Sequence, residues 1–431
     1  MSETARPIPA HGQEAPIAGH APGGFARMFG ALQSAPYYRT YWAGNQASLL
    51  VMQMQFVAMG YLAFTLTQSA AILGLVNLAT GLPGVVLSPI AGVLADRYPK
   101  RTLILIVQMV LCLTAVAMGV LASLGIIQWW HLMIAAFVQG TCFAVNMPAR
   151  QSWVPSLVPE EELANAIALN NAGLNAARII GPALGGVLIA VPFFGVNGIF
   201  YSSIPAVLWV YYTLFQIPIL GVPNGQKRAS FWAEFNSGLH SIVSSEVLAP
   251  LFLLALVTLL LGLSYQMLLP AFALGVFNSG SEGLGLMGAM VGAGALAGSL
   301  LMAYFSRSGN KAQIQTVAGT TLGVGLLVYG VASGMHLFIP SLLILFVLGA
   351  ATDFYSTINN TLILLNTDRD LFGRVMSIYM MTWSLAPLAS APFGTMMDKI
   401  GGPLTMIILG GILTVFFVGM TRFHPSYRRI K

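Results

Sequence analysis

The chain has 431 residues, of which 57% are hydrophobic and only 7% are charged. Soluble globular proteins carry about 25% charged residues, so this composition excludes a water-soluble enzyme and predicts a helical protein with several membrane spans. The formal net charge is +6, but the positive residues are scattered through short loops, so we expect no binding of nucleic acid. The cysteines Cys112 and Cys142 lie in apolar segments without metal-binding spacing, and we interpret them as buried apolar side chains.

Twelve runs of the chain are long and apolar enough to cross a bilayer, which takes about 20 residues. They are 41–65, 71–95, 102–124, 131–154, 163–190, 196–217, 247–273, 283–305, 313–334, 338–365, 372–397 and 402–422. The segment before them lacks a continuous apolar run, so we do not interpret it as a signal peptide. We expect an all-α polytopic membrane protein with a tail at 1–40, a six-helix half at 41–217, a linker at 218–246, a second half at 247–422 and a tail at 423–431.

The Lys and Arg residues are distributed unevenly between the two sides of the predicted spans. If the N-terminus lies inside, all of the 19 except Lys399 and the midspan Arg178 fall in cytoplasmic tails and loops. Cytoplasmic loops carry the Lys and Arg excess in membrane proteins. The sequence therefore predicts a multi-pass protein of the plasma (inner) membrane with both termini in the cytoplasm.

The two halves are related by an internal repeat. The pattern Phe-Val-x-Gly begins at Phe137 in the fourth span and again at Phe346 in the tenth, and the same spacing relates Gly185 to Gly394. Two parallel repeats around a site at the membrane midplane are an architecture of transporters. The repeat thus predicts two pseudo-symmetric bundles.

Three motifs resemble those of the major facilitator superfamily, and the resemblance covers about residues 35–422. The loop after the second span resembles that superfamily's G-x-L-x-D-R-x-x-x-R signature through Gly92, Asp96, Arg97, Lys100 and Arg101. The fifth span contains a sequence similar to its exporter motif G-P-x-x-G-G, formed by Gly181, Pro182, Gly185 and Gly186. The segments 146–151, 177–182 and 373–377 resemble the branch that contains the enterobactin exporter and drug-efflux proteins.

This resemblance implies that the loop after the second span is a gating motif that stabilises an outward-open state. Asp96 lies among three cations at the end of a helix, where it can also face the N-terminus of a helix from the other half. The alternative is a solvated turn that only fixes topology. Drug exporters of the superfamily often have an arginine where this chain has Ala136, so coupling through that arginine is excluded. The repeat-related loop keeps Arg307 without an aspartate, so we expect an asymmetric gate.

Two charges of opposite sign lie deep within predicted spans. Asp353 is the one carboxylate that we place in mid-membrane, and Arg178 lies at a similar depth in the fifth span. A lone charge at this depth costs roughly 2.5–3.5 kcal/mol on insertion scales, so such groups face the interior and find partners. We expect the two to interact, and Asp353 is our candidate for proton coupling. The alternatives are a fixed structural pair, or an arginine that caps backbone carbonyls.

The resemblance further implies that spans one, four, seven and ten line a central cavity, together with the facing parts of spans two, five, eight and eleven. Polar and aromatic residues of these spans are our candidates for substrate contact. They are Gln53, Gln55, Tyr61, Asn146, Asn171, Asn175, Tyr265, Gln266, Tyr355, Asn359, Tyr379 and Trp383.

Three functions compete. The motifs favour a secondary active exporter of a drug or siderophore by alternating access, with protons as the coupling ion. The alternative on the same fold is an importer of a nutrient or metabolite. A membrane enzyme or a scaffold is disfavoured, because no loop carries a catalytic motif, a metal cluster or a phosphate-binding loop for ATP. We therefore expect no cofactor and no metal, a lipid bilayer and a small molecule as partners, and a monomer.

Overall fold

The computed structural model describes residues 30–218, 231–305, 311–368, 371–383 and 385–423. Within these ranges every regular element is a helix, as the apolar runs predict. The surroundings of Gly92, the side chain of Asp96 and the loop residue Arg307 lie outside the described part of the chain.

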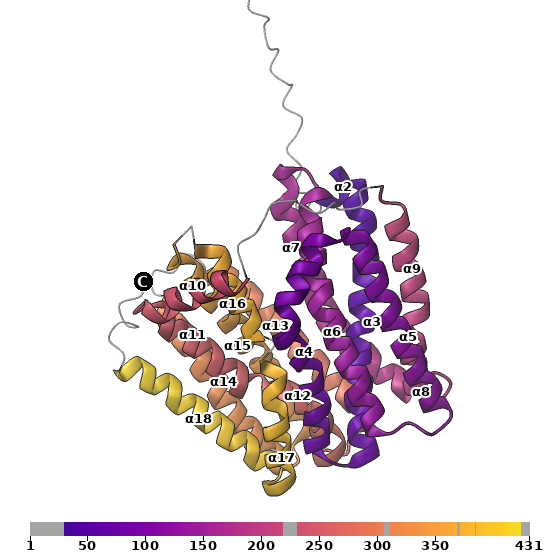
Figure 1. Ribbon diagram of the computed structural model, residues 1–431. Coiled ribbons are helices and arrows are strands. Elements are labelled where there is room, and N and C mark those ends of the chain that lie inside the picture. The colour runs from indigo at the N-terminus through magenta and orange to yellow at the C-terminus, as the bar shows by residue number, and fades with distance from the viewer. Residues whose placement is uncertain (1–29, 219–230, 306–310, 369–370, 384, 424–431) are drawn as a thin grey trace, which may run out of the picture.

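The first half is a bundle of long helices that cross the molecule in alternating directions (Figure 1). A short helix, α2 (Gly30–Ser34), precedes them. The bundle comprises α3 (Pro36–Thr67), α4 (Ala70–Arg97), α5 (Lys100–Ser123), α6 (Trp129–Trp153), α7 (Leu163–Ala190), and the pair α8 (Gly195–Tyr201) and α9 (Ser203–Phe215), which together make one crossing.

The second half repeats this arrangement after α10 (Phe231–Ser244). Its first crossing consists of α11 (Leu248–Val257) and α12 (Ser264–Ala271), each followed by a π-helical turn, at Thr258–Gly262 and Phe272–Val276. The remaining helices are α13 (Gly280–Phe305), α14 (Lys311–Gly334), α15 (Phe338–Leu365), α16 (Phe372–Trp383), α17 (Ser390–Ile400) and α18 (Gly402–Phe423).

The predicted span 372–397 is not one continuous helix. It is divided into α16 and α17 by the 3₁₀ turn Ala386–Ala389, which contains Pro387. Proline has no backbone N–H and its ring blocks a continuing α-helix, which accounts for the break. Eleven other helical segments in the described ranges are long and apolar enough to cross a membrane. Together with α16 and α17 they account for the predicted runs.

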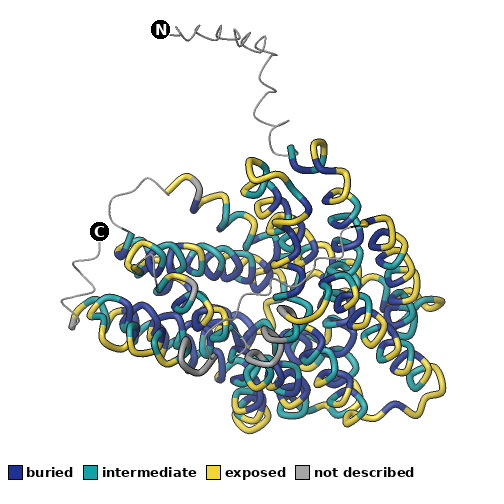
Figure 2. Tube along the Cα trace, turned by 45° about the horizontal axis from the view of Figure 1, so that its top comes forward, coloured by how far each residue is buried: buried dark blue, intermediate teal, exposed yellow. Residues whose placement is uncertain are grey.

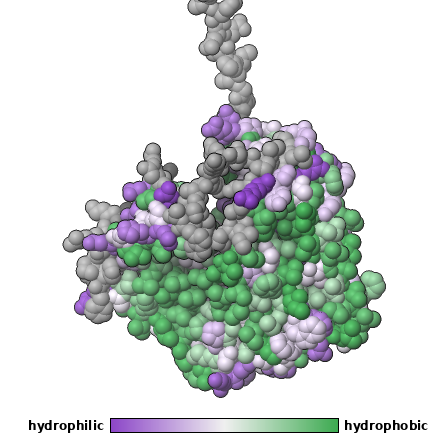
Figure 3. Space-filling model, in the orientation of Figure 1, coloured by the Kyte–Doolittle hydropathy of each residue, from purple (hydrophilic) through white to green (hydrophobic). Residues whose placement is uncertain are grey.

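The outer surface is apolar around the waist of the molecule. Figure 3 shows a broad hydrophobic belt with hydrophilic residues above and below it. Buried residues gather inside each bundle, whereas the rim is largely exposed (Figure 2). In water such a surface would be strongly unfavourable, so the belt is the part that lies in lipid.

The two bundles touch at one end and diverge at the other. The term joined end is used below for the end of the molecule that contains the turns 68–69, 124–128, 191–194, 277–279, 335–337 and 401. The opposite end, where α2 and α10 lie, is called the open end. The main contacts between the halves are made by α7 with α13, by α4 with α17, and by α12 with α3 and α4. Figure 1 shows the bundles apart at the open end.

Candidate functional site

The exporter-like motif of α7 has two faces, because residues four apart stack on one side of a helix. Gly181 and Gly185 face α3 of the same half. A Cβ atom on Gly185 would lie 3.4 Å from the Cα atom of Met54, and one on Gly181 would overlap the side chain of Gln53. These glycines therefore let α7 lie close against α3.

The other face of the motif meets the second half. A Cβ atom on Gly285 of α13 would lie 2.9 Å from the Cα atom of Gly186, and one on Gly288 would lie 2.6 Å from the Cβ atom of Pro182. The two helix backbones are thus nearly in contact. This small-residue packing is what closes the joined end between α7 and α13.

The second closing contact joins α4 to α17. A Cβ atom on Gly74 would lie 2.7 Å from the Cα atom of Ala391. The hydroxyl of Ser390 donates a hydrogen bond of 3.0 Å to the carbonyl oxygen of Gly74. The repeat pairs Gly394 of α17 with Gly185 of α7, and Gly394 likewise lies against the backbone of α4.

A polar stripe continues the closing face of α7 toward the open end. Asn171, Asn175 and Arg178 precede Pro182 and Gly186 at intervals of three and four residues, so all five share one face of the helix. Asn171 and Arg178 are exposed and Asn175 is partly exposed, although α7 packs against α3 and α13. This stripe therefore faces the space between the halves.

A carboxylate of the second half lies beside the same space. It belongs to α15, the neighbour of the facing helix α13. Ser299 follows the closing residues Gly288 and Gly292 on one face of α13, and its hydroxyl donates a hydrogen bond to a carboxylate oxygen of Asp353. Arg178 lies on the face of α7 that is turned toward the same space. No hydrogen bond joins Arg178 to Asp353 within the described ranges, so any attraction between these opposite charges acts across a gap.

The sequence did not indicate the role of a second arginine, Arg150. The Lys and Arg distribution counts it with the cytoplasmic loops although the predicted span 131–154 contains it; in the structure it belongs to α6 and is only 6% exposed. Its guanidinium donates 2.7 Å to Oδ1 of Asn45 and 3.0 Å to Oδ1 of Asn146, and lies 5.8 Å from the ring centroid of Tyr41. One nitrogen, Nη2, has no hydrogen-bond partner among the described residues.

The repeat places a neutral residue where the first half has Arg150. The equivalent position in α15 is Asn359, which is fully buried and accepts a hydrogen bond of 2.6 Å from Nε2 of Gln315. The charge pattern inside the two bundles therefore differs, although their helices correspond. The one signal in the sequence was a charge at the very end of a predicted span.

The gating motif begins at the end of α4. Arg97 is exposed, and Lys100 is 6% exposed in the first turn of α5. Arg101 donates 3.2 Å to the carbonyl oxygen of Ile217 and lies 4.7 Å from the ring centroid of Phe215, both near the end of α9. Arg101 therefore binds within its own half in this conformation. The gating role of Asp96 stays a prediction.

Other candidates for substrate contact divide into two groups by burial. Gln53, Tyr61, Gln266 and Trp383 are partly exposed, and Asn146 binds Arg150 as described above. The rest are buried inside a bundle. Gln55 and Gln139 line a cavity of about 20 Å³, and the hydroxyl oxygen of Tyr265 lies 3.4 Å from Nε2 of Gln266. Tyr355 packs on Phe417, and Tyr379 packs on Phe252. Substrate contact by any of them stays a prediction.

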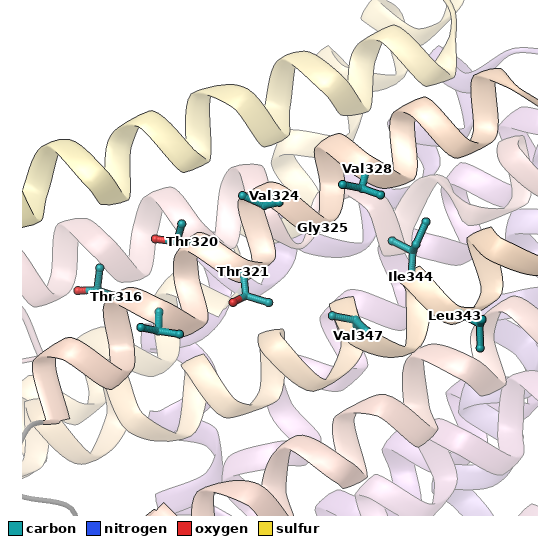
Figure 4. Close-up of a pocket in the computed structure, with 10 residues that line it drawn as sticks. Thr316, Thr320, Thr321, Val324, Gly325, Val328, Leu343, Ile344 and Val347 are labelled. Carbon is teal, nitrogen blue, oxygen red and sulfur yellow. The ribbon is translucent and has the colours of Figure 1, made fainter.

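One hollow in the described part of the chain lies away from the space between the halves. It is a groove of about 590 Å³ between α14 and α15, lined by residues such as Thr320, Val324 and Val347 (Figure 4). None of its lining residues belongs to the first half. Val317 and Leu343 in its walls are 65% and 62% exposed, so we assign this groove to the lipid-facing surface.

Comparisons with known proteins agree with this geometry. The family described as transmembrane secretion effector matches residues 29–425. Macrolide efflux protein A of Streptococcus pyogenes is 24% identical over 369 residues, which are 84% of this chain and 90% of that protein. The enterobactin exporter EntS of Salmonella typhi is 24% identical over 414 residues, 92% of this chain and 95% of that one.

The fold has solved counterparts as well. A crystal structure of a D-xylose-proton symporter superposes with a TM-score of 0.73 at 16% identity, covering 92% of this chain and 99% of that one. At this identity the likeness shows the fold alone. Taken with the family match and the efflux-type relatives, which are transporters and not enzymes, it identifies the chain as a multi-pass transporter that belongs to the transmembrane secretion effector family of the major facilitator superfamily.

Proposed function

We propose that this protein exports a small organic molecule of the drug or siderophore type from the cytoplasm by alternating access, with protons as the coupling ion. The observation that carries the proposal is the continuous face of α7. It closes on α13 through Pro182 and Gly186 and lines the inter-half space with Asn171, Asn175 and Arg178. A site open at one end and closed at the other is one of the two states that alternating access requires.

Export is supported by the relatives, which are named as efflux proteins and a siderophore exporter. With both termini in the cytoplasm, as the Lys and Arg distribution predicts, the open end faces the cytoplasm. The site in this conformation would then receive its substrate from inside the cell.

Coupling is assigned to Asp353. Its carboxylate belongs to the second half and binds Ser299 of the same half, while Arg178, on the face of α7 turned toward the space between the halves, carries the opposite charge. Protonation removes the negative charge and with it the attraction between the halves. A group that changes charge between the two states can thus link proton uptake to their rocking.

The first test is transport in everted membrane vesicles with an imposed pH gradient, using a macrolide and a catecholate siderophore as separate probes. The wild type should accumulate one of them only when the gradient is present. Asp353→Asn, which mimics the protonated carboxyl, should abolish gradient-driven transport while some substrate binding remains. Glu282→Gln is the matched control, because Glu282 is an exposed carboxylate at the start of α13.

Full gradient-driven transport by Asp353→Asn would falsify the coupling role and leave the pair as a structural bridge. Equilibration of a probe across the vesicle membrane without any gradient would show facilitated diffusion instead. Uptake of the probes into right-side-out vesicles under an inward proton gradient would favour the importer.

A further inference from the structure

A carboxylate of the second half caps a helix of the first half at the joined end. Asp398 of α17 accepts a hydrogen bond of 2.5 Å from the hydroxyl of Ser69, and bonds of 2.7 Å and 3.0 Å from the backbone N–H groups of Ala70 and Ala71. The first N–H groups of a helix have no partner within it. Here two of them are satisfied from the other half, and that of Ile72 is satisfied by Ser69 Oγ at 3.3 Å.

This contact has favourable electrostatics. The first turn of α4 carries the positive end of the helix dipole, and a carboxylate there is stabilised. Hydrogen bonds to a charged acceptor are also stronger than those between neutral groups. Since Asp398 is exposed, the contact is made at the rim and can be broken without opening the core of either bundle.

The contact is specific to one of the two closing pairs. The repeat that relates Gly185 to Gly394 relates Ile189 of α7 to Asp398 of α17. An isoleucine side chain cannot accept hydrogen bonds, so the contact of α7 with α13 lacks this capping carboxylate and rests on the packing of glycine and proline. The pair α4 and α17 closes by similar packing plus three charge-assisted hydrogen bonds.

We propose that Asp398 is a proton-sensitive latch that holds the joined end shut. In its ionised form both carboxylate oxygens accept, and all three donors are satisfied. In its protonated form one oxygen carries a hydrogen and becomes a donor, so it opposes the N–H groups of α4. Protonation from the solution at the joined end therefore favours separation of α4 from α17.

Few charged or titratable groups near Asp398 could offset the effect of its protonation on the contact between α4 and α17. Lys399 follows it on α17 and is exposed. The elements packed against α17 are α4, α12, α18 and the turn Ala386–Ala389. Where they approach the joined end, the described residues of these elements include no charged side chain. The buried Tyr265 of α12, which contacts Gln266, is the titratable group they contribute.

The test measures the distance across the joined end by pulsed electron paramagnetic resonance. Spin labels at Ile126 and Met335 report it, because these residues are 53% and 64% exposed on turns of different halves. The background replaces Cys112 and Cys142 by alanine. Asp398→Asn should raise the ratio of open to closed joined ends by about ten-fold. Asp398→Glu should stay closer to the wild type, and Glu282→Gln should leave the ratio unchanged.

The pH dependence separates a latch from a merely structural residue. Acidifying the medium should open the joined end of the wild type and should have a smaller effect on Asp398→Asn. An unchanged distance distribution in Asp398→Asn, or an equal shift in Glu282→Gln, overturns the proposal. If Asp398→Asn does not yield monodisperse protein, Ser69→Ala removes one donor and must shift the ratio in the same direction. The readout requires no transport, so it stands apart from the export hypothesis.

Discussion

Arg150 is a buried cation without a carboxylate among the residues that contact it. Asn45 and Asn146 accept its hydrogen bonds, and the ring of Tyr41 lies beside it. Amide oxygens and an aromatic face are weaker partners than an anion, yet they offset part of the cost of burying the charge. Tyr41 in turn packs edge-on against Trp153, with ring centroids 5.7 Å apart. Arg150 therefore ties α3 to α6 where the first half faces the open end.

Arg150→Ala should destabilise the protein. It leaves two amide oxygens unpaired inside the bundle, which costs about 1–3 kcal/mol in free energy of unfolding. The thermal midpoint in detergent should fall accordingly. Arg97→Ala is the control, because Arg97 is exposed; its midpoint should match that of the wild type. Equal midpoints for the two variants would mean that Arg150 is held without net stabilisation.

At the scale of helices, the close approach of α7 and α13 depends on the absence of side chains at three glycines. Gly285, Gly288 and Gly292 of α13 lie directly against Pro182, Gly186 and the backbone of residues 178 and 179. A methyl group at Gly285 or Gly292 meets backbone atoms, and one at Gly288 meets the ring of Pro182. Neither a backbone nor a proline ring can move aside as a flexible side chain can. Closing the joined end would then require α7 and α13 to separate.

Gly288→Ala should therefore shift the protein toward states with an open joined end and slow transport. Gly411→Ala is the matched control, since a Cβ on Gly411 of α18 meets no atom within 4 Å. The same spin-label distance, between Ile126 and Met335, measures the shift, and vesicle transport measures the rate. A wild-type distribution for Gly288→Ala would mean that α7 and α13 adjust without separating.

The helices themselves were predictable from the sequence, because lipid requires long apolar runs whose backbone groups are satisfied within one helix. The break before α17 was not predicted, because a proline in an apolar run does not always end a helix: Pro148, Pro182 and Pro270 lie inside α6, α7 and α12, whereas Pro387 lies in the break. The partners of Arg150 were equally hidden, because Asn45 is more than a hundred residues away on α3. The hydrogen bond from Ser299 of α13 to Asp353 of α15 could not be predicted. Depth in the span pointed to the charges of Asp353 and Arg178, but not to this serine.

For the whole molecule, the orientation in the membrane follows from the distribution of Lys and Arg. Glu282 and Lys399 are exposed at the joined end. A cysteine at either position should react with an impermeant maleimide added to intact cells, because we expect the joined end to face outward. A cysteine at Gly225 should react only after the membrane is opened. Labelling of position 225 in intact cells would reverse the orientation and place the joined end in the cytoplasm.

The helix pair α4 and α17 carries a carboxylate near the C-terminal end of each member, on opposite sides of the membrane. Asp398 caps the start of α4 at the joined end, whereas Asp96 lies in the last turn of α4 at the open end. Resemblance to the superfamily's loop signature assigns Asp96 to the outward-open state. The two residues should therefore stabilise opposite states.

Asp96→Asn should then shorten the mean distance between labels at Ile126 and Met335, which is the opposite of the effect expected for Asp398→Asn. Each single variant should transport slowly, because each leaves one state too stable, while expression stays near the wild type. The double variant should return the distance distribution toward that of the wild type, since independent effects on one equilibrium add as free energies. Unchanged distances in Asp96→Asn would mean that the loop after α4 only fixes topology. A shift in the same direction as that of Asp398→Asn would mean that Asp96, too, stabilises the closed joined end, and would contradict the opposite roles of the two carboxylates.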